Sequence, residues 1–265
     1  DSAFYRTIFP AGAYYGSWFW LSVPAFLFNW FLIFMPSWAY SVHWMLLWSL
    51  SIEEQFYLLY PFALKKLRGS KALVALLLAV IVLALIWRTV FFFYDRSNDF
   101  IQSFPSTSKF DLIAIGVLLF LAVRHYGKAL SRNPAASWAL CVAGALLSLA
   151  VYFGTQENNH WDEIYSSDLL GLGIFAFLLG GLHLPLFEHP YWKVLAMPGK
   201  YCYGCYMLHP FVLLFMGSWL HSLNVFLGFS LFIVATTLLG ASSFHLFETP
   251  VNLWFRRKFA GRPSP

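Results

Sequence analysis

Charged residues are scarce in this chain of 265 residues, of which only 11% are Asp, Glu, Lys or Arg. Soluble domains carry about 25% charged and roughly 45–50% apolar residues. This sequence is 60% apolar, with a mean hydropathy of +0.64. A soluble protein with a large aromatic core would need amphipathic helices, but the long runs here are apolar on every face. The composition therefore argues against a soluble domain and predicts a membrane protein.

Motifs of several enzyme classes are also absent. The sequence has no glycine-rich phosphate loop, no G-x-S-x-G turn and no H-E-x-x-H zinc motif. Its three cysteines, Cys141, Cys202 and Cys205, lie in apolar stretches, and we interpret them as buried small residues. No metal is expected, because no apolar stretch holds a clear cluster of metal ligands.

Apolar runs near the ~20 residues that cross a bilayer recur along the chain. They predict an all-α, polytopic transmembrane helical bundle with about eight spans. No linker or soluble domain divides it, so residues 1–265 are expected to form a single membrane domain. The predicted spans are residues 13–35, 45–64, 71–93, 110–124, 136–153, 167–187, 199–220 and 225–247.

Basic residues are distributed unevenly between the two sides of these spans. Segments on one side hold 14 of the 17 Lys and Arg residues, whereas Arg96 and Lys109 fall on the other and Arg88 lies late in a span. The positive-inside rule places the basic side, and both ends of this chain, in the cytoplasm. Acidic residues, Asp168 among them, are predicted in outside loops. The net charge of +5 reflects this bias and suits membrane lipid, with no reason to expect a nucleic acid partner.

Two adjacent carboxylates interrupt the second apolar run. Glu53 and Glu54 lie within residues 48–61, WSLSIEEQFYLLYP. An ionised carboxylate costs roughly 2.5–3.5 kcal/mol at the centre of a membrane helix, so it marks a functional site by default. At helical spacing Glu53 shares a polar stripe with Ser49 and Tyr57, whereas Glu54 faces leucines. Glu53 is the better functional candidate, and a structural hydrogen-bonding role between helices is an equal alternative.

A cation and an anion stand at the outer mouth of a later span. Lys109 and Asp111 would position a substrate there. Asp111 also falls where the helix starts, so capping of the helix and its positive dipole end is the favoured interpretation of this pair taken alone.

A proline interrupts the span that contains His209. Pro210 has no backbone N–H, which frees the carbonyl of Tyr206 four residues earlier. The imidazole would relay a proton, donate to a substrate carbonyl or simply pack against its neighbours. At the inner end of the last span, His245 and Glu248 share a helix face, where a structural pair or an interfacial anchor is favoured.

Together these segments resemble the membrane acyltransferase-3 family of bacterial O-acyltransferases. The family hallmark, WSLSVEEQFY before a Pro, is matched by residues 48–57 with Ile52 in place of Val. Lys109 stands where the family has Arg in an Arg-hydrophobic-Asp motif, and Cys202 stands where its G-x-S-Y-x-L-Y-x-x-H segment has Ser. These weaker matches, with a terminal E-x-P and an Arg-rich entry segment, are residues 109–116, 199–209, 248–250 and 6–15.

The resemblance also predicts what these residues do not contain. The family has two further helices at its N-terminus, which carry an Arg, a His proposed as the catalytic base and a Ser-Gly-Phe segment. No stretch of this chain supplies them. We therefore expect an N-terminally incomplete fragment or a truncated relative, unable to transfer an acyl group by itself.

The resemblance implies an enzyme of the bacterial inner membrane. It would transfer an acyl group such as acetyl from cytoplasmic acyl-CoA to a hydroxyl of a glycan or lipid-linked acceptor, without a permanently bound cofactor. A transporter or flippase is the alternative, since intramembrane carboxylates and broken helices also mark transport pathways, and an inactive scaffold subunit is another. The implied catalytic residues are Glu53 and His209, and the implied substrate-binding residues are Trp48, Ser51, Tyr57, Lys109 and Asp111.

Overall fold

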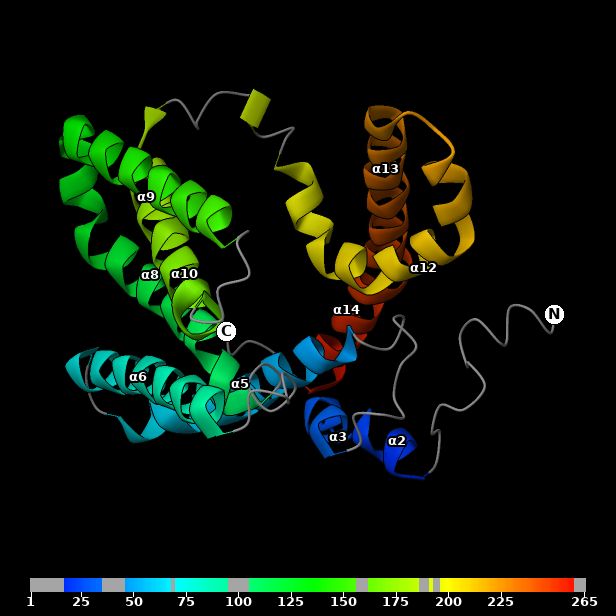
Figure 1. Cartoon of the computed structure of the whole chain (residues 1–265), viewed down its shortest axis with the longest axis horizontal. Coiled ribbons are helices and arrows are strands. Elements are labelled where there is room, and N and C mark those ends of the chain that lie inside the picture. The colour runs from blue at the N-terminus through cyan, green and yellow to red at the C-terminus, as the bar shows by residue number, and fades with distance from the viewer. Residues whose placement is uncertain are drawn as a thin grey trace. The chain divides into compact units, whose positions relative to one another are not determined.

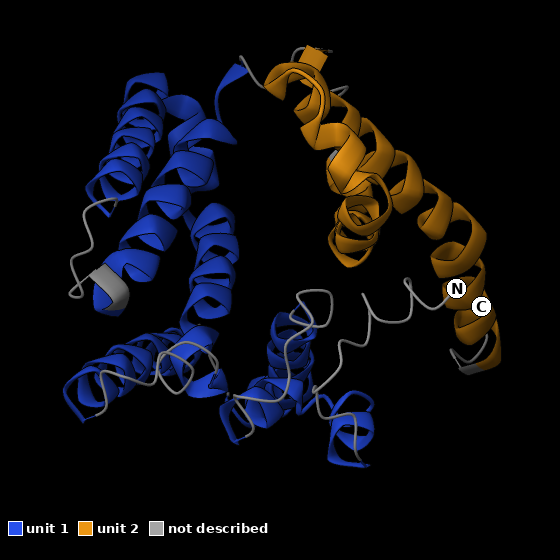
Figure 2. Ribbon diagram, turned by 45° about the vertical axis from the view of Figure 1, so that its right-hand side comes forward, with its two compact units in different colours: residues 1–187 blue, residues 188–265 orange. Residues whose placement is uncertain are grey.

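The computed structural model describes residues 17–34, 46–67, 70–94, 105–155, 162–185, 191–192 and 196–259. Within these ranges the regular elements are helices and no strand occurs, which confirms the all-α prediction (Figure 1). The chain divides into two compact units, Asp1–Phe187 and Glu188–Pro265 (Figure 2).

Five helical segments in the described part of the chain are long and apolar enough to cross a membrane. This confirms a polytopic, integral membrane protein, whereas the predicted count of about eight spans is not confirmed. The five segments are Lys71–Tyr94, Ser106–Arg132, Pro134–Gly154, Ile164–Gly181 and Val225–Lys258.

Two further predicted spans are helices of 20 residues, α5 (Leu47–Lys66) and α12 (Cys202–His221). Both are long enough to cross a bilayer but less apolar than the five. Charged residues lower the hydropathy of α5, and His209 with Pro210 interrupts the apolar surface of α12.

The first predicted span is not one continuous helix. Two short helices, α2 (Ser17–Ser22) and α3 (Phe28–Phe34), replace it. Between them Phe26 has a φ of 53°, which few residues other than glycine adopt. Helices of 6 and 7 residues rise only about 10 Å each, so neither crosses a bilayer alone.

The first unit is built on four long helices, α6 (Ser70–Tyr94), α8 (Ser106–Arg132), α9 (Pro134–Gly154) and α10 (Asp162–Gly181). Helix α8 packs against α6 and α10, and α10 packs closely along α9 (Figure 1). Glycine makes that last approach possible, since a Cβ on Gly144 would lie 2.2 Å from the backbone nitrogen of Phe177. These contacts bring the end of α6 beside the starts of α8 and α10.

The second unit pairs α12 with α13 (Val225–Ser243), after a 3₁₀ turn, η2 (Met197–Tyr201). A π-helical turn, η3 (Phe244–Glu248), joins α13 to α14 (Thr249–Phe259). The 34 residues of Val225–Lys258 would rise about 50 Å, well beyond the ~30 Å of a hydrocarbon core. One end of this segment therefore lies outside the hydrocarbon. That end is expected to be the one with Arg256, Arg257 and Lys258, because charged side chains are costly in lipid. The positive-inside rule predicts that it faces the cytoplasm.

Candidate functional site

Helix α5 carries the Glu-Glu segment and has two distinct faces. Ser51, Ile52 and Phe56 are buried, whereas Glu53 and Tyr57 are exposed. Residues four apart lie on the same side of a helix, so Ser51 continues into Gln55 on the inner face and Glu53 into Tyr57 on the outer one. One polar stripe, with Ser51 and Gln55, therefore faces the rest of the unit, and a second stripe, with Glu53 and Tyr57, lies on the exposed surface of the helix.

Ser51 belongs to the anchored face. Its hydroxyl accepts a hydrogen bond from the backbone N–H of Phe28 at 3.2 Å and donates to the carbonyl of Leu47 at 2.9 Å. The Phe28 N–H lies at the start of α3, where helical amides lack partners within the helix. Ser51, expected to bind substrate, therefore joins α5 to α3 in this structure.

Gln55 extends the same anchor to α8. Its amide nitrogen donates to the carbonyl of Phe26 at 2.5 Å and to Oδ1 of Asn29 at 3.0 Å. Its amide oxygen accepts from the hydroxyl of Ser106, which in turn accepts from Asn29 at 3.0 Å. Asn29 is fully buried. This network holds α3, α5 and the start of α8 together, and sequence reasoning assigned no role to Gln55 or Asn29.

The outer face of α5 leaves its carboxylates open. Glu53 is exposed and Glu54 half-buried, and no ion pair reaches either of them among the residues that the structure describes. Trp48 is half-buried one helical turn before Ile52. Among the described residues, Ser51 and Gln55 are side chains of the hallmark segment that hydrogen-bond to other helices, and a structural role for Glu53 stays untested.

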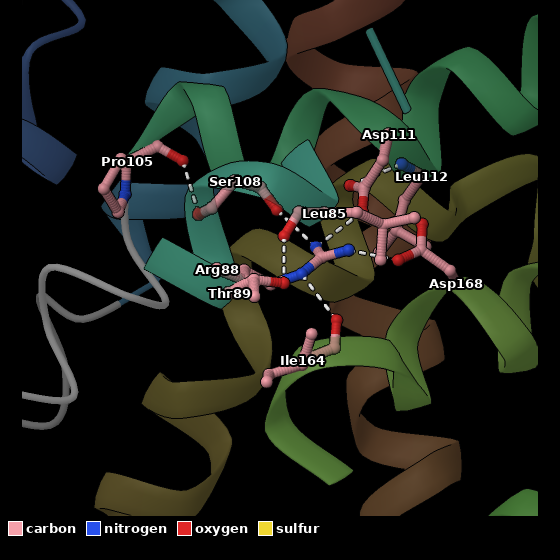
Figure 3. Close-up of polar contacts among 9 residues, drawn as sticks. All are labelled: Leu85, Arg88, Thr89, Pro105, Ser108, Asp111, Leu112, Ile164 and Asp168. Atoms are coloured by element: carbon pink, nitrogen blue, oxygen red, sulfur yellow. Dashed lines mark hydrogen bonds and ion pairs between the residues drawn. The ribbon is translucent and has the colours of Figure 1, made fainter. Parts of the chain in front are cut away.

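A buried ionic centre joins α6, α8 and α10 around Arg88, which is 2% exposed (Figure 3). Its guanidinium forms an ion pair with Asp111 at 2.6 Å and another with Asp168. It also donates to the carbonyls of Ser108 at 2.6 Å and Ile164 at 2.9 Å. All three guanidinium nitrogens are therefore engaged, which suits a structural clamp better than a free substrate-binding cation.

The position of Asp168 in this centre differs from the predicted one, and Asp111 has a buried ion-pair partner that the sequence did not indicate. Asp168 was expected in an outside loop, but it lies within α10 and is 6% exposed. Asp111 is fully buried, and besides Arg88 its carboxylate accepts from the N–H of Leu112 at 2.7 Å. Oδ1 of Asp168 is buried and has no hydrogen-bond partner among the residues that the structure describes. Two carboxylates around one guanidinium leave a formal excess of one negative charge at the clamp.

Lys109 lies beside this clamp on the first turn of α8 and is half-buried. No carboxylate within the described residues lies close enough to form an ion pair with its ammonium group. The neighbouring Phe110 packs its ring edge-on against Phe56 of α5, with centroids 5.5 Å apart. The hallmark helix and the Lys109 segment are therefore neighbours, as a shared site requires.

His209 sits at the proline interruption of α12. Its Nδ1 lies 2.6 Å from the carbonyl oxygen of Tyr206, the group that Pro210 leaves without its usual helical donor. His209 belongs to the second unit, whereas Glu53, Lys109 and Asp111 belong to the first. Convergence of all four on one cavity therefore stays a prediction.

In the second unit, no hydrogen bond or ion pair of the described residues joins His245 to Glu248. Nε2 of His245 instead lies 3.3 Å from the hydroxyl of Tyr201, and Glu248 accepts from the hydroxyl of Ser243 at 3.0 Å. Lys200 covers the ring of Phe244 at 5.0 Å. Across the described residues, no three His, Cys, Asp or Glu side chains gather as a metal site would require.

The chain is similar to known proteins over most of its length. A family model described as an acyltransferase domain, acyltransferase-3, matches residues 4–245. The chain belongs to the acyltransferase-3 family. The peptidoglycan O-acetyltransferase OatA of Listeria monocytogenes is 27% identical over 221 residues, which are 78% of this chain and 35% of OatA. YrhL of Bacillus subtilis is 26% identical over 234 residues, 82% of this chain and 36% of YrhL.

This acyltransferase-3 chain thus spans about a third of the length of the curated relatives that it matches. No solved structure gives a significant match. The matched region contains both the hallmark helix and the Arg88 clamp. Arg88 had a signal in the sequence, a lone cation inside an apolar run, but its partners lie 23 and 80 residues away in two other helices.

Proposed function

We propose that this chain is the membrane part of an O-acyltransferase that uses acyl-CoA as donor. The observation that carries the proposal is the division of α5, in which buried Ser51 and half-buried Gln55 anchor the helix while Glu53 and Tyr57 are exposed. A carboxylate without an ion pair among the described residues, within the hallmark segment of an acyltransferase family, is available for chemistry.

The reaction needs one proton acceptor and one site for negative charge. The acceptor hydroxyl loses its proton to a base, its oxygen attacks the thioester carbonyl carbon, and a tetrahedral oxyanion forms. Collapse of that intermediate breaks the carbon–sulfur bond, and the thiolate of CoA takes the proton back from the base. The products are an ester and free CoA.

Each open residue of the first unit has a role in this scheme. Glu53 would stabilise the positive charge that develops on a histidine base, which the family resemblance places on an upstream helix. Lys109 would position the acyl donor or meet the oxyanion, because its ammonium group has no carboxylate partner within the described residues. Asp111 would act indirectly, by fixing the start of α8 through Arg88.

The proposed acyl donor is supported by the charge of α14, and the proposed acceptor by the names of the relatives. Arg256, Arg257 and Lys258 are exposed in the last turn of α14, where they would attract the phosphates of CoA on the cytoplasmic side. OatA is named as a peptidoglycan O-acetyltransferase, so we propose an acetyl group and a glycan hydroxyl as the transferred group and its acceptor here.

Paired substitutions in α5 test this assignment. The assay follows transfer of labelled acetyl from acetyl-CoA to a glycan by the chain fused behind the two N-terminal helices of a family member. Glu53→Gln should lower turnover about 100-fold or more with a nearly unchanged unfolding temperature, because the exposed carboxylate forms no ion pair among the described residues. Glu54→Gln is the matched control and should matter much less. Equal losses from both variants, or a parallel loss of stability, would show that the pair is structural.

A further inference from the structure

The hydrogen bond between His209 and Tyr206 determines which ring nitrogen carries the proton. A carbonyl oxygen can only accept, so the 2.6 Å contact requires a hydrogen on Nδ1. A neutral imidazole with Nδ1–H has a lone pair on Nε2. Nε2 has no hydrogen-bond partner among the residues that the structure describes, and the side chain is only half-buried.

Pro210 is the reason why this carbonyl accepts from a side chain. In an uninterrupted helix the N–H of residue 210 would donate to the carbonyl of Tyr206. Pro210 lacks that N–H, and a proline inside a helix is intrinsically unfavourable. The ring of Tyr206 also lies against the imidazole, with centroids 5.6 Å apart. Pro210 and Tyr206 therefore hold the ring from one side in one tautomer.

We propose that Pro210 is a positioning residue that holds His209 as a proton acceptor through Nε2. Of the roles open to this histidine, donation to a substrate carbonyl needs a hydrogen on the free nitrogen, which the neutral Nδ1–H tautomer does not have. Proton acceptance needs the lone pair that this tautomer presents. The step is a proton relay: Nε2 takes up the proton that the upstream base has removed from the acceptor hydroxyl, and passes it to the departing thiolate. The inference rests on the proposed acyl transfer for its substrate, but not for its tautomer.

The tautomer can be measured without any activity. Nitrogen-15 NMR of histidine-labelled chain in lipid nanodiscs distinguishes Nδ1–H from Nε2–H rings, and His209→Gln identifies the signal. Neutral His209 should be the Nδ1–H form. Pro210→Ala returns a competing backbone donor, so the ratio of Nδ1–H to Nε2–H should fall about fivefold. Val212→Ala, at a buried site two residues later, is the control for lost packing and should leave the ratio unchanged. A neutral wild-type ring in the Nε2–H form, or a ratio unaffected by Pro210→Ala, would overturn the proposal.

The turnover of a His209 variant then distinguishes proton acceptance by the ring from hydrogen-bond donation to a substrate carbonyl. Glutamine keeps a hydrogen-bond donor but cannot accept a proton, so His209→Gln should lower kcat about 100-fold. Retained kcat in His209→Gln would instead support donation and contradict the proposal. The wild-type chain fused to upstream helices could show the expected tautomer but transfer no acyl group. That result would contradict both the proposed acyl transfer and proton acceptance by His209. The effect of Pro210 on the tautomer of the ring would still be supported.

Discussion

Two kinds of charged residue occur in the apolar segments of this protein. Arg88, Asp111 and Asp168 are buried, and each carboxylate forms an ion pair with Arg88 inside the first unit. Glu53 is exposed on the hallmark helix and takes part in no ion pair of the described chain. Buried ions are tolerated when they are paired, whereas an unpaired ion within an apolar segment usually serves a function.

Removal of the central cation should therefore destabilise the first unit severely. Arg88→Met leaves two buried carboxylates without compensation, at an expected cost of about 3–5 kcal/mol in unfolding free energy. Thermal and denaturant unfolding in detergent measure this change. Arg124→Met, at an exposed position on α8, is the control and should change stability by no more than about 0.5 kcal/mol.

Neutralising the two carboxylates of the clamp should rescue the stability of the Arg88→Met variant. Adding Asp111→Asn and Asp168→Asn to Arg88→Met removes every charge and should restore much of the lost stability. A triple variant no more stable than Arg88→Met alone would show that the carboxylates are not the cause of the loss.

At the scale of elements, helical periodicity predicted α5 and its outer stripe correctly but missed its inner one. Ser49, Glu53 and Tyr57 stand out because a charge lies at the centre of the stripe. Ser51 and Gln55 carry no charge, and their partners are backbone and side-chain groups near Phe26, Asn29 and Ser106, which only the folded chain brings close. The freed carbonyl of Tyr206 was predictable because proline acts on its own helix.

The packing of α9 on α10 gives a prediction with a matched control. Gly144→Ala places a Cβ 2.2 Å from the Phe177 backbone, which cannot move aside without separating the helices. We expect a loss of at least about 1–3 kcal/mol in unfolding free energy. Gly116→Ala in α8 meets nothing within 4 Å and should be neutral or stabilising, because alanine is the better helix former. Equal effects from the two substitutions would contradict the close contact.

For the whole molecule, length and hydropathy predicted a polytopic helical protein but not its number of spans. Residues 17–34 are apolar enough to be read as one span, yet the chain turns between α2 and α3. Side chains buried at this turn, such as Phe19 and Phe28 in edge-to-face contact at 5.7 Å, are indistinguishable by composition from residues that face lipid. The ion pairs of Arg88 show that the end of α6 lies beside the starts of α8 and α10.

The orientation of these helices remains a prediction from charge. Residues 65–71, 124–132, 187–200 and 256–265 should be cytoplasmic, and residues 155–167 should lie outside. Single cysteines at Asn158→Cys and Lys128→Cys, in a chain without its native cysteines, test this in intact cells. A membrane-impermeant thiol reagent should label position 158 without permeabilisation and position 128 only after it. The reverse pattern would invert the topology.

Acyl transfer itself is the most direct test of the account. Residues 1–265 are reconstituted in vesicles, alone and fused behind the two N-terminal helices of a family member, with labelled acetyl-CoA and a peptidoglycan glycan acceptor. The fused chain should form a base-labile acetyl ester on the glycan, and Glu53→Gln in the same chain should not. Residues 1–265 alone should insert into the vesicles, because apolar spans and flanking charges suffice for insertion. Glycan acetylation that proceeds equally well with Glu53→Gln would contradict the central claim that the open carboxylate of α5 serves acyl transfer.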